Sequence, residues 1–226
     1  LALGAPPERS KVIPNGIDIA RFTGIVRKPR EGFHVGLVGR VVPIKDIKTF
    51  ITVAHIVHSQ IPESVFYCVG PTDEDPDYYE ECTSLIQALD LTDVFLLTGP
   101  QDVREYYAFL DLLVLTSLSE AQPLVILEAQ AAGVPVVSTR VGDVPDLLER
   151  ENRFIAPPKD ARGLAERIVS VYRDRENVQS WVNQRKQTII QRYDRRAIFD
   201  QYGRIYETIG NDSSVGNSSS AGNDNL

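Results

Sequence analysis

Residues 33–58 read FHVGLVGRVVPIKDIKTFITVAHIVH. The run begins with a continuous apolar stretch rich in Val and Leu, which is typical of a β-strand covered on both faces. It continues with apolar side chains spaced three and four residues apart, the pattern of a helix that buries one face. A buried strand followed at once by a helix is the unit of parallel sheets. This stretch therefore predicts one such unit.

The same pairing of strand and helix recurs along the chain. The further strand-like runs, each followed by a helix-like segment, are SVFYCVG, VFLLTG, LLVLTS, PVVSTR and RFIAPP. Joined by short links, these units predict an α/β domain over residues 33–176, with a doubly wound, Rossmann-like parallel sheet and helices on both sides.

The segments that flank this domain differ from it. We predict that residues 1–32 form a linker, with a short strand and a Pro-Asn-Gly turn in KVIPNGIDIARF. Residues 177–209 carry two further helical patterns and predict C-terminal helices. Residues 210–226 are rich in Gly, Ser and Asn and nearly devoid of apolar side chains, so we predict a disordered tail.

Composition excludes several classes of protein. The 226 residues, 42% of them hydrophobic, carry a formal net charge of −7, which argues against a nucleic-acid partner because such a domain needs a basic face. No run approaches the ~18 apolar residues of a membrane-spanning helix, and no signal peptide is apparent. With two cysteines that suggest a reducing compartment, the expectation is a cytoplasmic protein. The chain lacks methionine and begins with Leu1, which predicts a piece of a longer protein.

Two cations follow the first predicted strand. Ligands of a doubly wound sheet bind beyond the carboxyl ends of its strands, where neither the dinucleotide motif G-x-G-x-x-G nor a phosphate loop is present. Arg40 comes directly after Gly39 at the end of the strand, and Lys45 stands at the start of the next helix. Near a helix N-terminus they suit a diphosphate. Position alone leaves open that both are ordinary surface cations.

Two carboxylates bracket an apolar segment, SEAQPLVILEAQAAGVPVV, at residues 119–137. Glu120 falls in the loop after the strand LLVLTS, and Pro123 suits the first turn of the next helix. The exposed amides around Leu124 and Val125 can receive an anion, and Glu128 lies one turn farther along the same helix face. Both carboxylates could accept hydrogen bonds from sugar hydroxyls. The alternative is a loop residue and a carboxylate on the solvent face of the helix.

Two other clusters could in principle be cation sites. His55 and His58 have a helical spacing that can bind metal, but the sequence offers no evident third ligand. The acidic residues Asp73, Glu74, Asp75 and Asp77 are more typical of a solvated loop than of a cation site. We predict no metal.

The motifs PNGIDIARF, GRVVPIK and SEAQPLVILEAQAAGVPVVSTRVGDVPDLL closely resemble, in order and spacing, the C-terminal half of retaining family 4 glycosyltransferases. The resemblance covers residues 11–207 and implies one half of a GT-B fold, with a missing N-terminal domain that carries most of the acceptor site. Within the family, EAQPLVILEA and GRVVPIKDIKTF are most similar to the transferases that polymerise the Pel exopolysaccharide of bacterial biofilms.

The resemblance also implies roles for individual residues. Arg40 and Lys45 would bind the donor diphosphate and stabilise the leaving nucleotide, Glu120 would contact the donor sugar, and Glu128 the ribose. Further substrate contacts would come from Gly39, from the backbone of Gln122, Pro123, Leu124 and Val125, from the cleft-facing turn Asn15-Gly16, and from Gly142 in a loop that closes the cleft. Many members have Gly-Phe-Gly where this chain has Ala121-Gln122-Pro123, and a second glycine where it has Asp143.

The activity implied is transfer of a sugar from a UDP-sugar to a growing exopolysaccharide, with retention of configuration and without metal or cofactor. The implied partners are the UDP-sugar, a polysaccharide or sugar acceptor, the missing N-terminal domain and a biosynthetic complex at the inner membrane. We expect this chain alone to be inactive. The alternatives are a GT-B sugar-nucleotide epimerase or phosphorylase, and a scaffold domain without catalysis. A scaffold would need none of Arg40, Lys45, Glu120 and Glu128.

Overall fold

A computed structural model of the chain describes residues 10–214, with side chains described up to residue 208. Its centre is a six-stranded sheet in the order β3-β2-β1-β4-β5-β6, in which every neighbouring pair of strands is parallel. The strands are β1 (Phe33–Val38), β2 (Ser64–Val69), β3 (Phe95–Gly99), β4 (Leu112–Leu115), β5 (Val136–Thr139) and β6 (Ile155–Ala156). The doubly wound sheet predicted from the sequence is confirmed.

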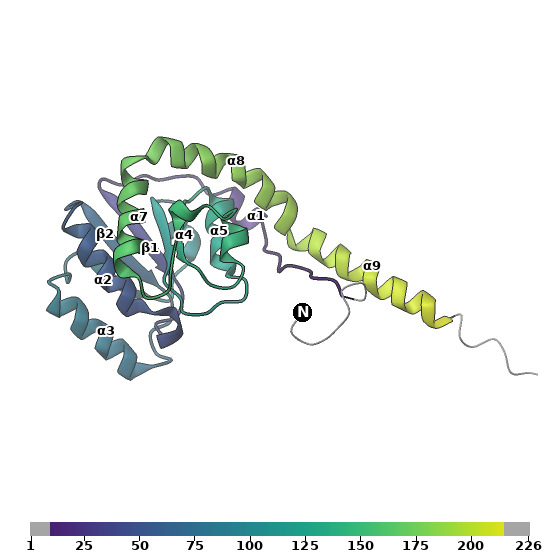
Figure 1. Ribbon diagram of the computed structural model, residues 1–226, viewed down its shortest axis with the longest axis horizontal. Coiled ribbons are helices and arrows are strands. Elements are labelled where there is room, and N and C mark those ends of the chain that lie inside the picture. Colours follow the sequence, from purple (N-terminus) through teal and green to yellow (C-terminus); the bar gives the residue numbers. More distant parts are fainter. Residues whose placement is uncertain (1–9, 215–226) are drawn as a thin grey trace, which may run out of the picture.

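Helices cover the sheet and continue beyond it (Figure 1). They are α1 (Ala20–Thr23), α2 (Ile47–His58), α3 (Pro76–Ala88), α4 (Val103–Tyr107), α5 (Leu124–Ala132), α6 (Val144–Leu147), α7 (Ala161–Arg173), α8 (Arg175–Tyr193) and α9 (Arg195–Ser214), with short 3₁₀ turns η2 (Pro43–Lys45) and η3 (Asn152–Phe154). Asp75, Asp102 and Asp160 cap the starts of α3, α4 and α7 by accepting backbone N–H bonds.

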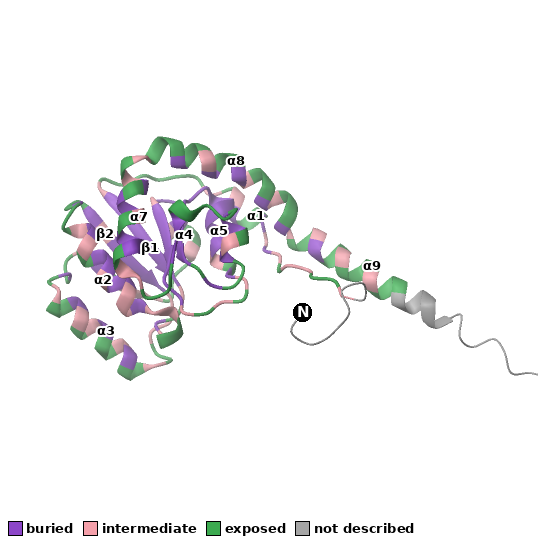
Figure 2. Cartoon of the chain, in the orientation of Figure 1, coloured by how far each residue is buried: buried purple, intermediate pink, exposed green. Residues whose placement is uncertain are grey.

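The core lies in and around the sheet, as the buried central strands in Figure 2 show. Every residue of β1, β4, β5 and β6 is buried, because helices or neighbouring segments cover both faces. This explains why these strands read as unbroken apolar runs. Only the edge strand β3 is largely half-exposed.

The arrangement of strands fixes where the site must lie. β1 has β2 on one side and β4 on the other, so the winding of the chain reverses between β1 and β4. In a doubly wound sheet, ligands bind at the carboxyl edge where the winding reverses in this way. Arg40, Lys45 and Glu120 all belong to these loops.

Two expectations about the flanking segments were wrong. KVIPNGIDIARF forms no strand; it makes one isolated parallel bridge, between Ile17 and Asp194, and then turns into α1. The partner of Ile17 is the junction of α8 and α9 rather than an extended segment, so the pairing cannot propagate into a ladder. The helix α9 runs to Ser214, past residue 210 where we predicted disorder, since extending an existing helix is far easier than starting one. The rest of that tail, and residues 1–9, lie outside the described residues.

Within the part of the chain that the structure describes, no helix combines the length and the apolar character needed to span a bilayer.

Candidate functional site

Lys45 and Glu120 meet at the carboxyl edge of the sheet. The Lys45 Nζ lies 2.6 Å from the Glu120 Oε1, and the two side chains are only 19% and 15% exposed. The backbone holds the two loops together as well: the Thr116 hydroxyl donates to the carbonyl oxygen of Lys45 at 2.8 Å, and the Leu118 N–H donates to that of Ile44 at 2.9 Å. The cation after β1 and the carboxylate after β4 thus form one fixed unit.

The carboxylate of Glu120 is held through one of its oxygens. Oε1 accepts a hydrogen bond from the Lys45 ammonium and another from the buried Ser117 hydroxyl, at 2.6 and 2.7 Å. Among the described residues no hydrogen bond to Oε2 is found. This oxygen is therefore free to accept a hydrogen bond from a ligand hydroxyl, while the other keeps the group in place.

Gly142 supports the backbone of the Glu120 loop from behind. Its φ is +46°, and a Cβ at this position would lie 2.2 Å from the Glu120 carbonyl oxygen and 2.3 Å from that of Ala121. The next N–H, of Asp143, donates to the Ala121 carbonyl at 2.8 Å. Only glycine allows so close an approach, so Gly142 determines where Glu120 stands.

Glu128 lies half-buried on α5, so it does not belong to a fully solvated face. Burial raises the pKa of its carboxyl, while a hydrogen bond from Tyr107 and the charge of Arg21 partly lower it. The Tyr107 hydroxyl, in a side chain with no exposed surface, lies 3.4 Å from the Glu128 Oε2. Burial, followed by the nearby Glu128 charge, raises the pKa of Tyr107 well above its usual range. The carboxylate of Glu128 is thus partly desolvated by the surrounding protein.

Arg40 differs from Lys45 in its partner. Its Nη1 lies 2.7 Å from the Glu74 Oε2, and the two side chains are 52% and 42% exposed. The strand ends that carry them are close, since the Gly39 N–H donates to the Val69 carbonyl at 2.9 Å. The predicted cationic pair is therefore divided into a shielded Lys45 and an Arg40 at the solvent-exposed rim.

The start of α5 follows directly after the loop that carries Glu120. Pro123 occupies the N-cap position, one residue before the first turn where we expected it, and no side chain caps the helix. The amides that follow it, from Leu124 onward, can therefore serve an anion. Leu124 is 40% exposed, and Val125 is half-buried.

The turn at residues 15 and 16 reaches the same loop. The Asn15 N–H donates to the Gln122 Oε1 at 2.5 Å, so the linker contacts the segment between the two glutamates. Gly16 has a packing role: a Cβ there would lie 2.6 Å from the Arg195 Cα. Asn15 thus borders the predicted site, whereas Gly16 faces α9.

Several residues of the site were not found in the sequence. Ser117 and Tyr107 hold the two glutamates, but a buried serine and a tyrosine in a short helix carry no distinguishing pattern. In the sequence Glu74 was only one of four acidic residues after the second predicted strand, and its pairing with Arg40 depends on the strand order, which the structure supplies. The structure forms no group of three or more potential metal ligands within the described residues, and His58 instead contacts the Ser64 hydroxyl at 3.3 Å.

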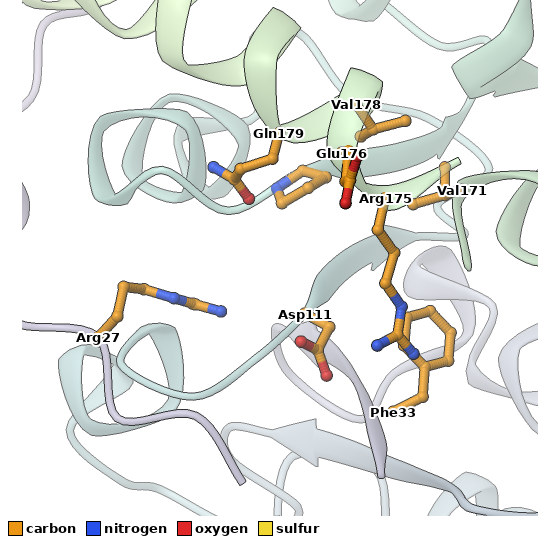
Figure 3. Close-up of a pocket in the computed structure, with 9 residues that line it drawn as sticks. Arg27, Phe33, Asp111, Val171, Arg175, Glu176, Val178 and Gln179 are labelled. Carbon is orange, nitrogen blue, oxygen red and sulfur yellow. The ribbon is translucent and has the colours of Figure 1, made fainter. Parts of the chain in front are cut away.

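A separate pocket lies at the opposite edge of the sheet. It has a volume of about 270 Å³ and is lined by residues at the amino ends of β1, β4 and β5 and by the start of α8. Figure 3 shows Arg27, Asp111, Glu176 and Arg175 around this hollow. Because ligands of such sheets bind beyond the carboxyl ends, this pocket is not the predicted site.

Curated proteins of known name are similar to much of this chain. WcaL of Salmonella typhimurium strain LT2, whose name assigns it to colanic acid biosynthesis, is 27% identical over 92% of this chain and 53% of its own length. The Escherichia coli UDP-Gal:alpha-D-GlcNAc-diphosphoundecaprenol alpha-1,3-galactosyltransferase is 30% identical over 75% of this chain and 46% of its own. The chain thus spans about half the length of these relatives.

Among solved structures, Anabaena Alr3699/HepE in complex with UDP-glucose superposes with a TM-score of 0.81 at 25% sequence identity, over 91% of this chain and 59% of that one. The family model described as glycosyl transferases group 1 matches residues 32–174, which contain all six strands of the sheet. The chain belongs to the group 1 glycosyltransferases.

Proposed function

We propose that this chain is the donor-binding half of a retaining GT-B glycosyltransferase that transfers a sugar from a UDP-sugar. The observation that carries the proposal is the fixed Lys45–Glu120 pair at the carboxyl edge, with the uncapped start of α5 and the half-buried Glu128 on the same helix. A cation, helix amides and two carboxylates suit a diphosphate between two polyhydroxylated groups.

The roles of the individual residues are those that the family resemblance implies. The acceptor hydroxyl would attack the anomeric carbon from the face on which the diphosphate leaves, and its proton would pass to the departing phosphate oxygen as the sugar–oxygen bond breaks. Lys45 and Arg40 would stabilise the charge that grows on the diphosphate. Glu120 would accept a hydrogen bond from the donor sugar through its free oxygen, and Glu128 would accept one from the ribose. No step requires a metal ion or cofactor.

The substrate and the setting are part of the proposal. The acceptor would be a growing exopolysaccharide, which the colanic acid name of WcaL supports at the level of substrate class. From the narrower resemblance to PelF, a transferase that polymerises the Pel exopolysaccharide, we propose the Pel polysaccharide. An N-terminal domain in the longer protein would carry most of the acceptor site. The enzyme would work in the cytoplasm, attached to an inner-membrane complex through partners.

Titration calorimetry and a transfer assay test the proposal. UDP should bind the chain weakly, and neither the chain alone nor a Lys45→Ala variant of the longer protein should transfer glucose from UDP-glucose efficiently. Lys48→Ala is the matched control, because Lys48 pairs with Glu81 at the exposed start of α2, 2.5 Å away, outside the site.

The rival functions give other results. An epimerase would convert the UDP-sugar with no acceptor present, and a scaffold domain would bind UDP with no turnover in the longer protein. Robust transfer by the chain alone would overturn the two-domain assignment.

A further inference from the structure

Glu74 lies in the loop after β2 and holds the outer cation of the donor site. The ends of β1 and β2 are side by side: a Cβ on Gly70 would lie 2.2 Å from the Gly39 carbonyl oxygen. This packing places Arg40, two residues after the end of β1, beside the β2 loop that contains Glu74. The sheet itself therefore brings this carboxylate to Arg40.

The pair is of a kind that a ligand can replace. One guanidinium nitrogen, Nη1, contacts Glu74 at 2.7 Å, and both side chains are about half exposed. Exposed ion pairs contribute about 0–1 kcal/mol, so a diphosphate can displace the carboxylate at little cost. Lys45 is different, because its pair with Glu120 is shielded and braced by Ser117.

We propose that Glu74 competes with the donor diphosphate for Arg40 and thereby sets the affinity for the nucleotide product. The inference rests on the proposed function, in which Arg40 binds the diphosphate. When UDP leaves, the guanidinium exchanges a phosphate oxygen for the Glu74 carboxylate and is never left without a counter-charge. Product release is thereby made easier, at the expense of tighter binding.

The test is calorimetric titration of the chain with UDP, and with inorganic pyrophosphate as a second probe. Glu74→Gln removes the competing charge and should tighten UDP binding about two- to fivefold, the equivalent of ~0.4–1 kcal/mol for one exposed pair. Asp73→Asn is the matched control: it removes the same charge from the next position, which is exposed and makes no described ion pair. Its effect should be smaller and should vanish at high salt.

A double mutant sharpens the test. In an Arg40→Gln background, Glu74→Gln should tighten UDP binding no more than Asp73→Asn does, since the contested cation is gone. If Glu74→Gln weakens UDP binding, or matches Asp73→Asn in the wild-type background, the competition is disproved while the donor site stands. If the wild-type chain binds neither UDP nor pyrophosphate, the donor site falls, and the inference falls with it.

Discussion

The charged side chains at the two edges of the sheet are arranged differently: among the described residues, those at one edge form ion pairs, and those at the other do not. At the carboxyl edge, cations and carboxylates stand on short loops and meet in ion pairs, Lys45 with Glu120 and Arg40 with Glu74. At the amino edge, four charged side chains surround a hollow of about 270 Å³, and none of the described ion pairs joins two of them. There the Arg27 guanidinium donates instead to the carbonyl oxygens of Tyr107 and Leu110, at 2.8 and 2.7 Å.

The difference separates an unpaired group of charges from a paired one. The hollow is at the edge where parallel sheets do not bind their ligands. The groups suited to a nucleotide sugar lie at the other edge, where Lys45 and Glu120 are paired and mostly shielded from solvent. Chemistry and topology, rather than the shape of a cavity, point to the candidate site.

Lys45→Ala is expected to have the largest effect. In the longer protein it should lower kcat/KM by roughly 10²–10³, the range for loss of one electrostatic stabiliser of a developing anion. Because Glu120 would lose its shielded partner, a modest drop in stability should accompany the loss. Steady-state kinetics and thermal unfolding measure both, with Lys48→Ala beside it. An unchanged rate would mean that Lys45 has no part in catalysis, and the carboxyl edge would then have no stronger claim to the site than the amino edge.

Replacing each glutamate in turn should distinguish the residue that contacts the donor sugar from the one that contacts the ribose. Glu128→Gln should weaken UDP binding by ~1.5–3 kcal/mol, as for loss of a hydrogen bond to a charged group. Glu120→Gln should leave UDP affinity nearly unchanged and sharply lower transfer. UDP titration and turnover of both variants of the longer protein test this. Equal loss of UDP affinity in the two variants would contradict the division of roles. No change of either variant in either assay would exclude the site.

Glu128 also gives the carboxyl edge a pH dependence. Burial raises its folded-state pKa above the usual 4.5, so the ionised group destabilises the fold at neutral pH, and stability is gained as the pH falls through the raised pKa. UDP affinity should fall in that same window. Glu128→Gln should therefore raise the free energy of unfolding at pH 7, a gain that disappears at acid pH. Chemical denaturation at both pH values measures it.

Gly142→Ala tests the support of the Glu120 loop. The new methyl group would collide with two carbonyl oxygens at a φ of +46°, so we expect a loss of roughly 1–3 kcal/mol of stability and a lower rate of transfer. Gly133→Ala is the control, because Gly133 has a φ of +80° and nothing within 4 Å of a Cβ. Thermal unfolding of the two variants isolates the collision from the strain. Equal losses would show that Gly142 does not position the loop.

Arg175→Ala at the amino-edge pocket should have the smallest effect. Its guanidinium lies over the Tyr172 and Phe33 rings, 4.2 and 5.1 Å from their centroids. Losing these contacts should cost about 0.5–1 kcal/mol of stability and leave UDP affinity unchanged. A clear change in UDP binding would mean that the two edges are coupled.

The sequence predicted the sheet well because its signal is local. Each strand is an unbroken apolar run, and the position of Arg40, Lys45 and Glu120 after strands placed them at one edge. The pairing of these residues was beyond reach, since it depends on which strands are neighbours. The order that puts β2 beside β1 brings Glu74 to Arg40, and the turn after β1 meets the β4 loop through Thr116 and Leu118. The failed strand at residues 11–22 has the same cause: its partner is a helix junction far along the chain.

The bridge at Ile17 connects the N-terminal segment to the junction of α8 and α9. Ile17 donates to the Tyr193 carbonyl and accepts from the Arg195 N–H, at 2.9 and 3.0 Å, and Asp18 pairs with Arg195 at 2.9 Å. A force applied to α9 would therefore act on these contacts before it acts on any strand. Two residues before Ile17, the Asn15 N–H is bound to Gln122, between the two glutamates. A movement of α9 would therefore reach the loop between Glu120 and Glu128, in the candidate site, through these contacts.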